Sequence, residues 1–280
     1  MKLRTYSTLA ALALAGVATP ALADQDGRSF TGPYIAVSGG FSTTDNKNDD
    51  RVVFDTNRDG QYGEDVFTST RANAFSPGFC KGSSTLNSQT VTLCDRDHDD
   101  AAYAVRLGYD GRIGSNIAGG ILIEASKSDS TDSVTAFSTT PAGYSFTRGI
   151  DYAVSIRGRI GFAPGDRGLI YLTAGPSYAR IKHSFTTTNT ANSFTAVNPD
   201  KMVFGGQVGG GAEIMLGGGF SLGMEYLYNR YHDDKYYVAI GNGTAGPTNP
   251  FVLAGGVNAR PSGGGRYDFH TFSAVLGFHF

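Results

Sequence analysis

The sequence predicts an all-β protein, specifically an eight-stranded antiparallel up-and-down transmembrane β-barrel with long extracellular loops and short periplasmic turns. The 280 residues include 39 glycines, 18 phenylalanines and 15 tyrosines, and only 17% are charged. Apolar residues recur at every second position, which is the period of a β-strand. Long and short connections alternate between the repeating segments, as they do in outer-membrane barrels.

The N-terminal residues predict export. Residues 1–23 combine Lys2 and Arg4, an apolar run and the small-residue sequence Ala21-Leu22-Ala23, which together are typical of a removed signal peptide. A membrane anchor is the alternative, but the run is shorter than the roughly 20 residues of a spanning helix. We expect residues 24–280 to form a single barrel domain. Its 21 basic and 25 acidic residues leave a formal charge of −4, which does not indicate nucleic-acid binding.

Eight segments show the two-residue alternation. In the last of them Phe272, Ala274, Leu276, Phe278 and Phe280 share one face. No apolar stretch after residue 23 is long enough to cross a bilayer as a helix, so any membrane span must consist of strands. The eight predicted strands lie within residues 34–41, 101–110, 116–126, 151–162, 168–185, 202–216, 220–231 and 269–280.

The connections between these segments support a barrel. Four are long and polar, at residues 44–99, 128–149, 188–200 and 233–265. Three are tight turns, at residues 111–115, 163–168 and 217–219. Because the strand number is even and short turns face the periplasm, we expect both termini on the periplasmic side.

The charged residues of the strands fall on the face opposite the large apolar residues, which predicts a polar lumen. They are Arg106, Asp110, Glu124, Arg157, Arg159, Glu213 and Glu225. Such charges either neutralise one another or line a narrow ion path. The interior of an eight-stranded barrel is just wide enough for side chains to fill it. We therefore predict a filled lumen with a structural or surface-interaction role, and a narrow porin is the alternative.

The first long connection, residues 44–99, predicts a calcium site. Asp55, Asn57 and Asp59 precede Gly60 and match the first half of a calcium-binding loop, in which the Gln61 carbonyl would be the next ligand. The second half does not match. We expect acids at the far end of the connection to complete the site, namely Asp95, Asp97 and Asp99. A solvated acidic loop without a metal is the alternative, since 11 of the 25 acidic residues lie between positions 45 and 100.

Cys80 and Cys94 lie in the same connection and enclose thirteen residues. In an exported protein two cysteines predict one disulfide. Closure of that loop would contribute about 3 kcal/mol in the chain-entropy model. A metal-binding or redox-active role of the two cysteines is the alternative, but the spacing fits no common zinc pattern.

The histidines do not predict an enzyme. Nucleophilic catalysis needs a Ser or Asp within reach of a His and a third group. His183 and Ser184 are adjacent, but neighbours on a strand point to opposite faces. The other histidines have no partner pattern.

The opening SFTGPYIAVSGGFS, the eight alternating segments and the closing FSAVLGFHF resemble the small outer-membrane β-barrel or opacity-porin family of Gram-negative bacteria, related in shape to the membrane domain of OmpA. The resemblance implies that Phe280, Phe278 and Leu276 form the signal read by the barrel-insertion machinery. It also implies an environment of outer-membrane lipids and lipopolysaccharide. Tyrosines of the sequence YLYNRYHDDKYY, from Tyr226 to Tyr237, are expected to anchor the chain at the interface or to contact lipopolysaccharide, an extracellular partner or another copy.

Overall fold

The fold was determined as a computed structural model that describes residues 30–44, 51–75, 97–139, 142–165, 167–262 and 265–280. The predicted signal peptide, Cys80, Cys94 and Asp95 lie outside these residues. The elements are β1 (Gly32–Thr44), β2 (Val52–Asp55), β3 (Asp100–Ile113), β4 (Ile117–Ser128), β5 (Thr131–Phe137), β6 (Gly143–Phe162), β7 (Gly168–Thr187), β8 (Ser193–Val197), β9 (Asp200–Gly217), β10 (Phe220–Tyr231), β11 (Tyr237–Gly241), α2 (Pro250–Leu253), β12 (Val257–Pro261) and β13 (Tyr267–His279).

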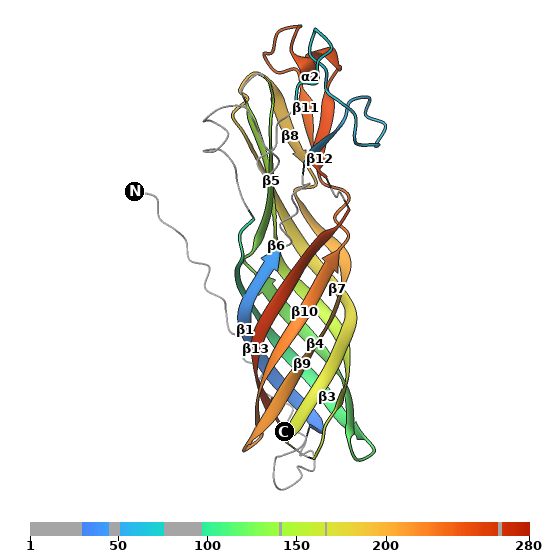
Figure 1. Cartoon of the computed structure of the whole chain (residues 1–280), viewed down its shortest axis with the longest axis vertical. Helices are drawn as coiled ribbons and strands as arrows, with labels where there is room; N and C mark the ends of the chain where they lie inside the picture. The colour runs from blue at the N-terminus through green and yellow to red at the C-terminus, as the bar shows by residue number, and fades with distance from the viewer. Residues whose placement is uncertain (1–29, 45–50, 76–96, 140–141, 166, 263–264) are drawn as a thin grey trace, which may run out of the picture.

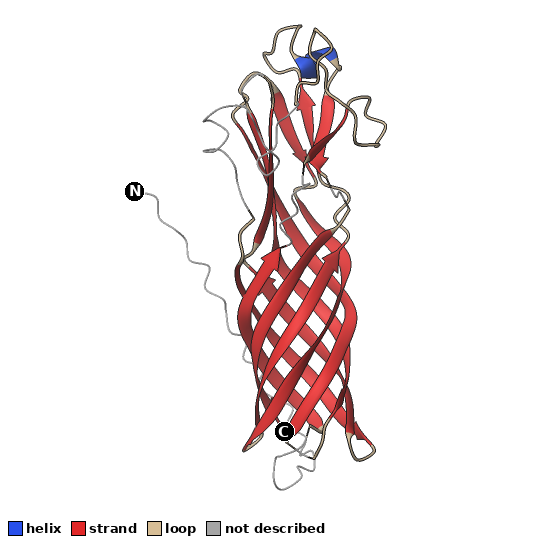
Figure 2. Ribbon diagram, in the orientation of Figure 1, coloured by secondary structure: helices blue, strands red, loops and turns tan. Residues whose placement is uncertain are grey.

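Eight long strands form a closed antiparallel barrel, which confirms the predicted fold. Their order around the wall is β4-β3-β1-β13-β10-β9-β7-β6, and pairing of β4 with β6 closes the ring. The first and last strands are neighbours, with Tyr34 opposite His279. The tight turns lie at one end with the C-terminus, and the long connections rise from the other end (Figures 1 and 2).

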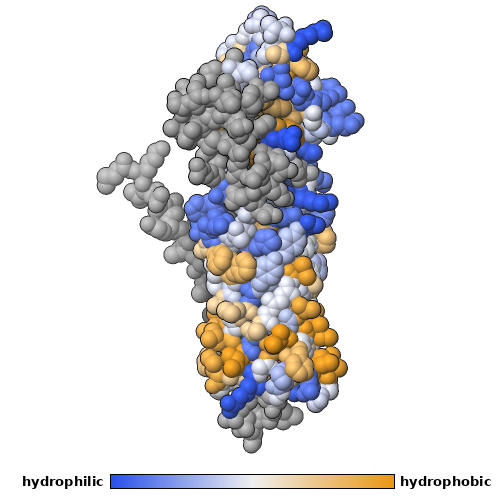
Figure 3. All heavy atoms as spheres, in the orientation of Figure 1, coloured by the Kyte–Doolittle hydropathy of each residue, from blue (hydrophilic) through white to orange (hydrophobic). Residues whose placement is uncertain are grey.

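The two faces of the barrel wall differ in polarity, and β3 shows the pattern. Its Val105 and Leu107 point outward and are 52% and 58% exposed, whereas Arg106 between them is 3% exposed. On the face seen in Figure 3, the large apolar residues gather on the half of the barrel that carries the tight turns. An apolar outer belt around a polar interior fits a barrel surrounded by lipid. Within the described residues, no helix has the length and hydrophobicity that a membrane span requires.

The long connections fold above the barrel into a second unit, which we call the crown and define as the described residues of 51–75, 131–147, 184–199 and 233–262. A four-stranded sheet in the order β2-β12-β11-β8 forms one side of it. The opposite side is the extension of β6 and β7 beyond the barrel together with β5, which pairs with β6. The two sides stand next to each other in Figure 1. The sequence predicted long polar connections in this region, and it did not predict their short strands.

The crown has an apolar core of its own. It joins residues from all four long connections, including Phe54, Phe75, Tyr144, Val238 and Phe251, all at most 5% exposed. The rings of Phe54 and Phe75 are 4.5 Å apart, and those of Phe75 and Phe251 are 5.9 Å apart. Phe251 lies on α2, where the Asn249 side chain caps the helix by accepting a hydrogen bond from the Phe251 amide at 3.0 Å. This core ties the connections into one compact head.

Candidate functional site

The lumen is filled by successive layers of side chains, beginning near the tight turns. An apolar layer closes that end and consists of Phe30, Ala118, Ala163, Leu169, Tyr171 and Met215. Immediately above it lies the turn-side charge cluster, in which Arg159 pairs with Asp110 and, at 2.9 Å, with Glu213. The Arg159 guanidinium also lies over the rings of Tyr34 and Tyr171, at 4.5 and 5.2 Å. Three predicted lumen charges therefore meet in one layer.

Glycines on neighbouring strands make room for the tyrosines of this layer. A Cβ atom on Gly108 would collide with the Tyr34 ring, and one on Gly211 would come within 2.6 Å of the Tyr171 hydroxyl. Close approach of one side chain to the neighbouring backbone explains why this small barrel needs so many inward glycines. The large rings then occupy the width that smaller side chains would leave open.

The central charge cluster joins the other four predicted lumen residues. Arg106 pairs with Glu124 and, at 2.6 Å, with Glu225. Arg157 bonds Glu124 at 2.7 Å and Glu225 at 3.2 Å. All four side chains are at most 4% exposed. Two guanidinium groups and two carboxylates thus neutralise one another across β3, β4, β6 and β10, which satisfies the rule that buried charges are paired.

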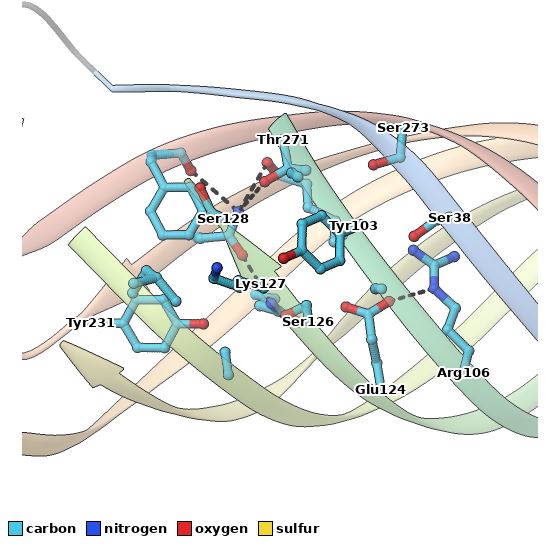
Figure 4. Close-up of a pocket in the computed structure, with 18 residues that line it drawn as sticks. Ser38, Tyr103, Arg106, Glu124, Ser126, Lys127, Ser128, Tyr231, Thr271 and Ser273 are labelled. Atoms are coloured by element: carbon cyan, nitrogen blue, oxygen red, sulfur yellow. Dashed lines mark hydrogen bonds and ion pairs between the residues drawn. The ribbon is translucent and has the colours of Figure 1, made fainter. Parts of the chain in front are cut away.

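A small polar cavity lies above the central cluster. Its volume is about 30 Å³, and its lining includes Ser38, Ser128, Thr271 and Ser273. Figure 4 shows these hydroxyl groups around the space, with the Arg106–Glu124 pair at one end and Tyr231 at the other. A cavity of that size holds about two water molecules.

Two further layers cross the lumen before the crown begins. The first is apolar and aromatic and contains Ile150, Ala153, Ala179, Ile181, Tyr231, Tyr267 and Phe269. The second, the waist cluster, joins Arg148 to Asp132 at 2.8 Å and to Asp233 at 2.9 Å. His183 contributes its Nε2 atom, 2.9 Å from the same Asp233 carboxylate. Ionic and apolar layers therefore alternate from the turns to the crown.

The waist cluster shifts the titration of its central acid. Burial alone would raise the pKa of the Asp233 carboxyl. The hydrogen bond to His183 and the charges of His183 and Arg148 outweigh burial and lower that pKa below its ordinary value. Because Asp233 follows β10 and Arg148 belongs to β6, this charged group fastens the crown to the rim of the barrel.

The predicted calcium motif forms a compact loop in the crown. The Asp55 carboxylate is fully buried and accepts hydrogen bonds from the amides of Asp59 at 3.1 Å and Gly60 at 3.0 Å. The Asn57 side-chain oxygen accepts from the Asp59 amide, and Asp59 accepts from the Gln61 amide at 2.8 Å. The four predicted ligands therefore lie together, and three of their side chains hold loop amides.

Glu64 closes this loop from its other end. Its carboxylate accepts hydrogen bonds from the amide and the hydroxyl of Thr56, both at 2.6 Å, and from the Asn57 side chain at 2.9 Å. The bond from the Thr56 hydroxyl is the largest of the effects that lower the pKa of Glu64. Side-chain oxygens therefore accept hydrogen bonds from backbone amides at both ends of this loop.

Two other predicted calcium ligands, Asp97 and Asp99, lie outside this loop, in the segment that precedes β3. The Asp97 carboxylate accepts from the Ser133 amide at 2.9 Å, and Asp99 accepts from the Thr44 amide at 3.3 Å. Within the part of the chain that the structure describes, no three His, Cys, Asp or Glu side chains are grouped so as to hold a metal ion. Calcium binding therefore stays a prediction.

The structure separates the tyrosines that the sequence grouped together. Tyr226 is exposed on the outer wall and bonds His270, whereas Tyr231 and Tyr236 are buried at 0% and 5% exposure. The terminal Phe280 and Leu276 lie on the outer wall at 59% and 46% exposure, and Phe278 packs between Phe220 and Phe280. The residues of the predicted insertion signal therefore form one lipid-facing strip.

Comparisons with known proteins place these features in a wider group. The model of the outer membrane protein beta-barrel domain family matches residues 9–280. The 31 kDa outer-membrane immunogenic proteins of Brucella melitensis and Brucella suis are each 27% identical over 124 residues, which are 44% of this chain and 51% of the relative. The chain thus spans about half the length of the curated relatives it matches.

Two solved structures are similar to this chain. The outer membrane protein OprG of Pseudomonas aeruginosa aligns over 91% of this chain and 99% of its own, with a TM-score of 0.48 and 12% identity. The attachment invasion locus protein Ail of Yersinia pestis, solved with a heparin analogue, aligns over 89% of this chain and 100% of its own, with a TM-score of 0.31 and 8% identity.

Proposed function

The chain belongs to the outer membrane protein beta-barrel domain family, and we propose that it is a closed outer-membrane barrel whose function is to display the crown as a rigid extracellular interaction head. In this proposal the barrel is a pedestal, and recognition takes place on the crown. Lipopolysaccharide would surround the outer rim of the barrel, and the barrel-insertion machinery would recognise the strip of Phe280, Phe278 and Leu276.

The observation that carries this proposal is the layered filling of the lumen. The central charge cluster is at most 4% exposed, and apolar layers lie on both sides of the two charge clusters. The crown core adds a further apolar cluster above the waist cluster. A porin needs a continuous polar path, whereas these layers support a structural barrel.

Conductance in a planar lipid bilayer tests the closed lumen. We expect the folded wild-type protein to show no single-channel steps under conditions in which a general porin conducts. A variant with Arg157→Ala and Tyr231→Ala, which removes one side chain from an ionic layer and one from an aromatic layer, is the positive control for opening. Regular steps from the wild type would favour the narrow porin instead.

Labelling of intact cells tests the outward orientation of the crown. Both cysteines are first replaced by serine, and Thr244→Cys is then introduced in the crown and Ser115→Cys in a tight turn. We expect a membrane-impermeant maleimide to label the crown variant on intact cells and the turn variant only after permeabilisation. The opposite pattern would reverse the proposed orientation.

The proposal extends to the first long connection. A disulfide between Cys80 and Cys94 would fasten it, and calcium at the Asp55 loop would stiffen it further. Mass spectrometry of the non-reduced and reduced protein tests the disulfide, because a 2 Da difference distinguishes the oxidised from the reduced pair. A free-thiol mass without reductant would contradict it.

A further inference from the structure

The geometry points to a docking surface for an acidic segment of a partner protein on the outer face of the crown sheet. This inference rests on the proposed function of the crown as an interaction head. The surface comprises Arg51, Arg58, Tyr62, Tyr237 and Arg260, and we call it the Arg–Tyr face. The opposite face of the same sheet packs into the crown core.

Strand register places these residues on one side of the sheet. Arg260 is paired with Val53 on β2, so both point away from the core, as their partial exposure shows. Tyr237 on β11 lies in the next position of the same row, because the adjacent pair Val238 and Ala259 points into the core. Arg51 extends this side, since its carbonyl accepts from the Ser262 amide at 2.5 Å and continues the ladder, while its own amide donates to the Ser262 hydroxyl at 2.8 Å.

The loop after β2 adds the remaining residues. The Arg260 guanidinium lies 3.9 Å above the ring of Tyr62. Arg58 adopts a left-handed backbone conformation, with φ of 60°, and its guanidinium lies against the backbone of Gly256. The hydrogen bonds of the Asp55 and Glu64 carboxylates fix this loop. The oxygen-rich motif therefore presents an arginine and a tyrosine over the sheet.

The arginines of this face differ in their pairing from those of the lumen, which are all held by carboxylates. Of the described residues, none places a carboxylate within 4.0 Å of the guanidinium groups of Arg51, Arg58 or Arg260. The Nε atom of Arg260 is buried and has no hydrogen-bond partner among them. Asp55 belongs to the same side of the sheet, but its carboxylate is fully buried and bonded to loop amides. The face is thus basic at its surface.

The composition of the face favours a protein as the partner. Tyrosine and arginine are the residue types most enriched at protein interfaces and at their energetic hot spots. Val53 and Ala239 are partly exposed between the charged groups and offer apolar contact to side chains. Guanidinium groups bind carboxylates in paired hydrogen bonds, so the complementary segment is rich in Asp or Glu.

Binding of labelled poly-L-glutamate to the full detergent-folded chain tests this inference. The test variant is Arg58→Glu with Arg260→Glu. The matched control is Lys201→Glu with Arg230→Glu, which changes the net charge equally at exposed basic residues of the barrel strands β9 and β10. We expect the test pair to weaken binding at least tenfold and the control pair less than twofold. Tyr62→Ala should weaken it about threefold, because Arg260 loses its stacking partner.

The outcomes separate the alternatives. If the test pair loses the protease resistance of the crown, Arg58→Gln with Arg260→Gln replaces it. Absence of wild-type binding at low salt, or equal weakening by the control pair, would overturn the inference. Face-dependent binding of dextran sulfate without binding of poly-L-glutamate would identify an acidic glycan and overturn the protein partner. A crown that labels from outside above a closed lumen would leave the proposed function intact in each of these cases.

Discussion

The barrel and the crown bury opposite kinds of side chain although they share two strands. The barrel buries arginines and carboxylates and turns Val105, Leu107 and similar residues outward. The crown buries Phe54, Phe251 and Val238 and exposes arginines. The surroundings explain this difference. Lipid favours apolar side chains on the outer surface of the barrel, and water favours burial of apolar side chains in the core of the crown. Strands β6 and β7 cross from one region to the other near the waist cluster.

The difference also separates what stabilises each region. In the barrel, every buried charge depends on a partner from another strand. In the crown, stability depends on aromatic packing between connections that are far apart in the chain. Variants in one region should therefore leave the other folded, and the following variants test that independence.

The largest effect is expected from Arg157→Met in the central charge cluster. Two carboxylates, Glu124 and Glu225, would then share only Arg106, and an unbalanced buried charge costs about 3–5 kcal/mol. Urea unfolding of the detergent-folded barrel, followed by circular dichroism, measures the loss. Arg180→Met is the control, since its side chain is 39% exposed with partners at 3.5 and 3.7 Å, and it should change stability by less than about 1 kcal/mol.

A slightly smaller effect is expected from Phe251→Ala in the crown core. Removal of this ring leaves a cavity and should lower the free energy of unfolding of the crown by about 3 kcal/mol. Limited proteolysis should cleave the crown of the variant while the barrel keeps its folded mobility in unheated gel samples. Leu253→Ala lies two residues away at 50% exposure and should behave as wild type. Unfolding of the barrel together with the crown would show that the two regions are not independent.

The waist cluster joins the two regions. Asp233→Asn should therefore lower the stability of the crown by about 2 kcal/mol. The pKa of Asp233 is lowered in the folded protein. Its contribution is therefore complete above the pKa of an unfolded aspartate, about 3.9, and is lost as the pH falls through the folded pKa. The wild type should lose crown stability below about pH 4 more steeply than the variant. Equal pH profiles would contradict this role, and exposed Asp234→Asn serves as the control.

The smallest effect is expected from Asp55→Ala, which removes the acceptor for two loop amides and should cost about 1 kcal/mol of crown stability. Thermal unfolding in EGTA measures this part alone. An additional rise of the melting temperature in calcium, present in the wild type and absent from the variant, would establish the predicted metal site. Identical wild-type curves in calcium and EGTA would leave the loop as a purely hydrogen-bonded support.

The barrel could be predicted because lipid imposes a strict rule on its outer face. Every second residue must be apolar or small, and the tight turns mark the strand ends, so all eight strands were located. The inward set followed from the same alternation. The sequence could not predict which charges pair. Arg157 on β6 and Glu225 on β10 are not on neighbouring strands, so they meet only once the barrel is closed.

The crown was missed because its strands are short and their partners are distant in sequence. Strand β2 has four residues, and its Asp55 lies opposite Asn258. Alternation over four or five residues does not distinguish a strand from a loop. The spacing of Asp55, Asn57 and Asp59 predicted oxygens that converge on a cation, whereas in the structure these oxygens accept hydrogen bonds from loop amides, which compete with cations for the same lone pairs. Tyr62 and Arg58 had no signal of their own.

Pairing of the first strand with the last has a consequence for biogenesis. Because Tyr34 lies opposite His279, the ring cannot close until the final residues of the chain have been delivered. Until then β1 and β13 expose open edges, and Arg157 lacks Glu225 from the late strand β10. A strand-by-strand entry into lipid would carry unpaired guanidinium groups with it. Closure of the ring and neutralisation of its lumen therefore both depend on the last strands of the sequence, so the C-terminal segment is the final structural requirement for a complete barrel.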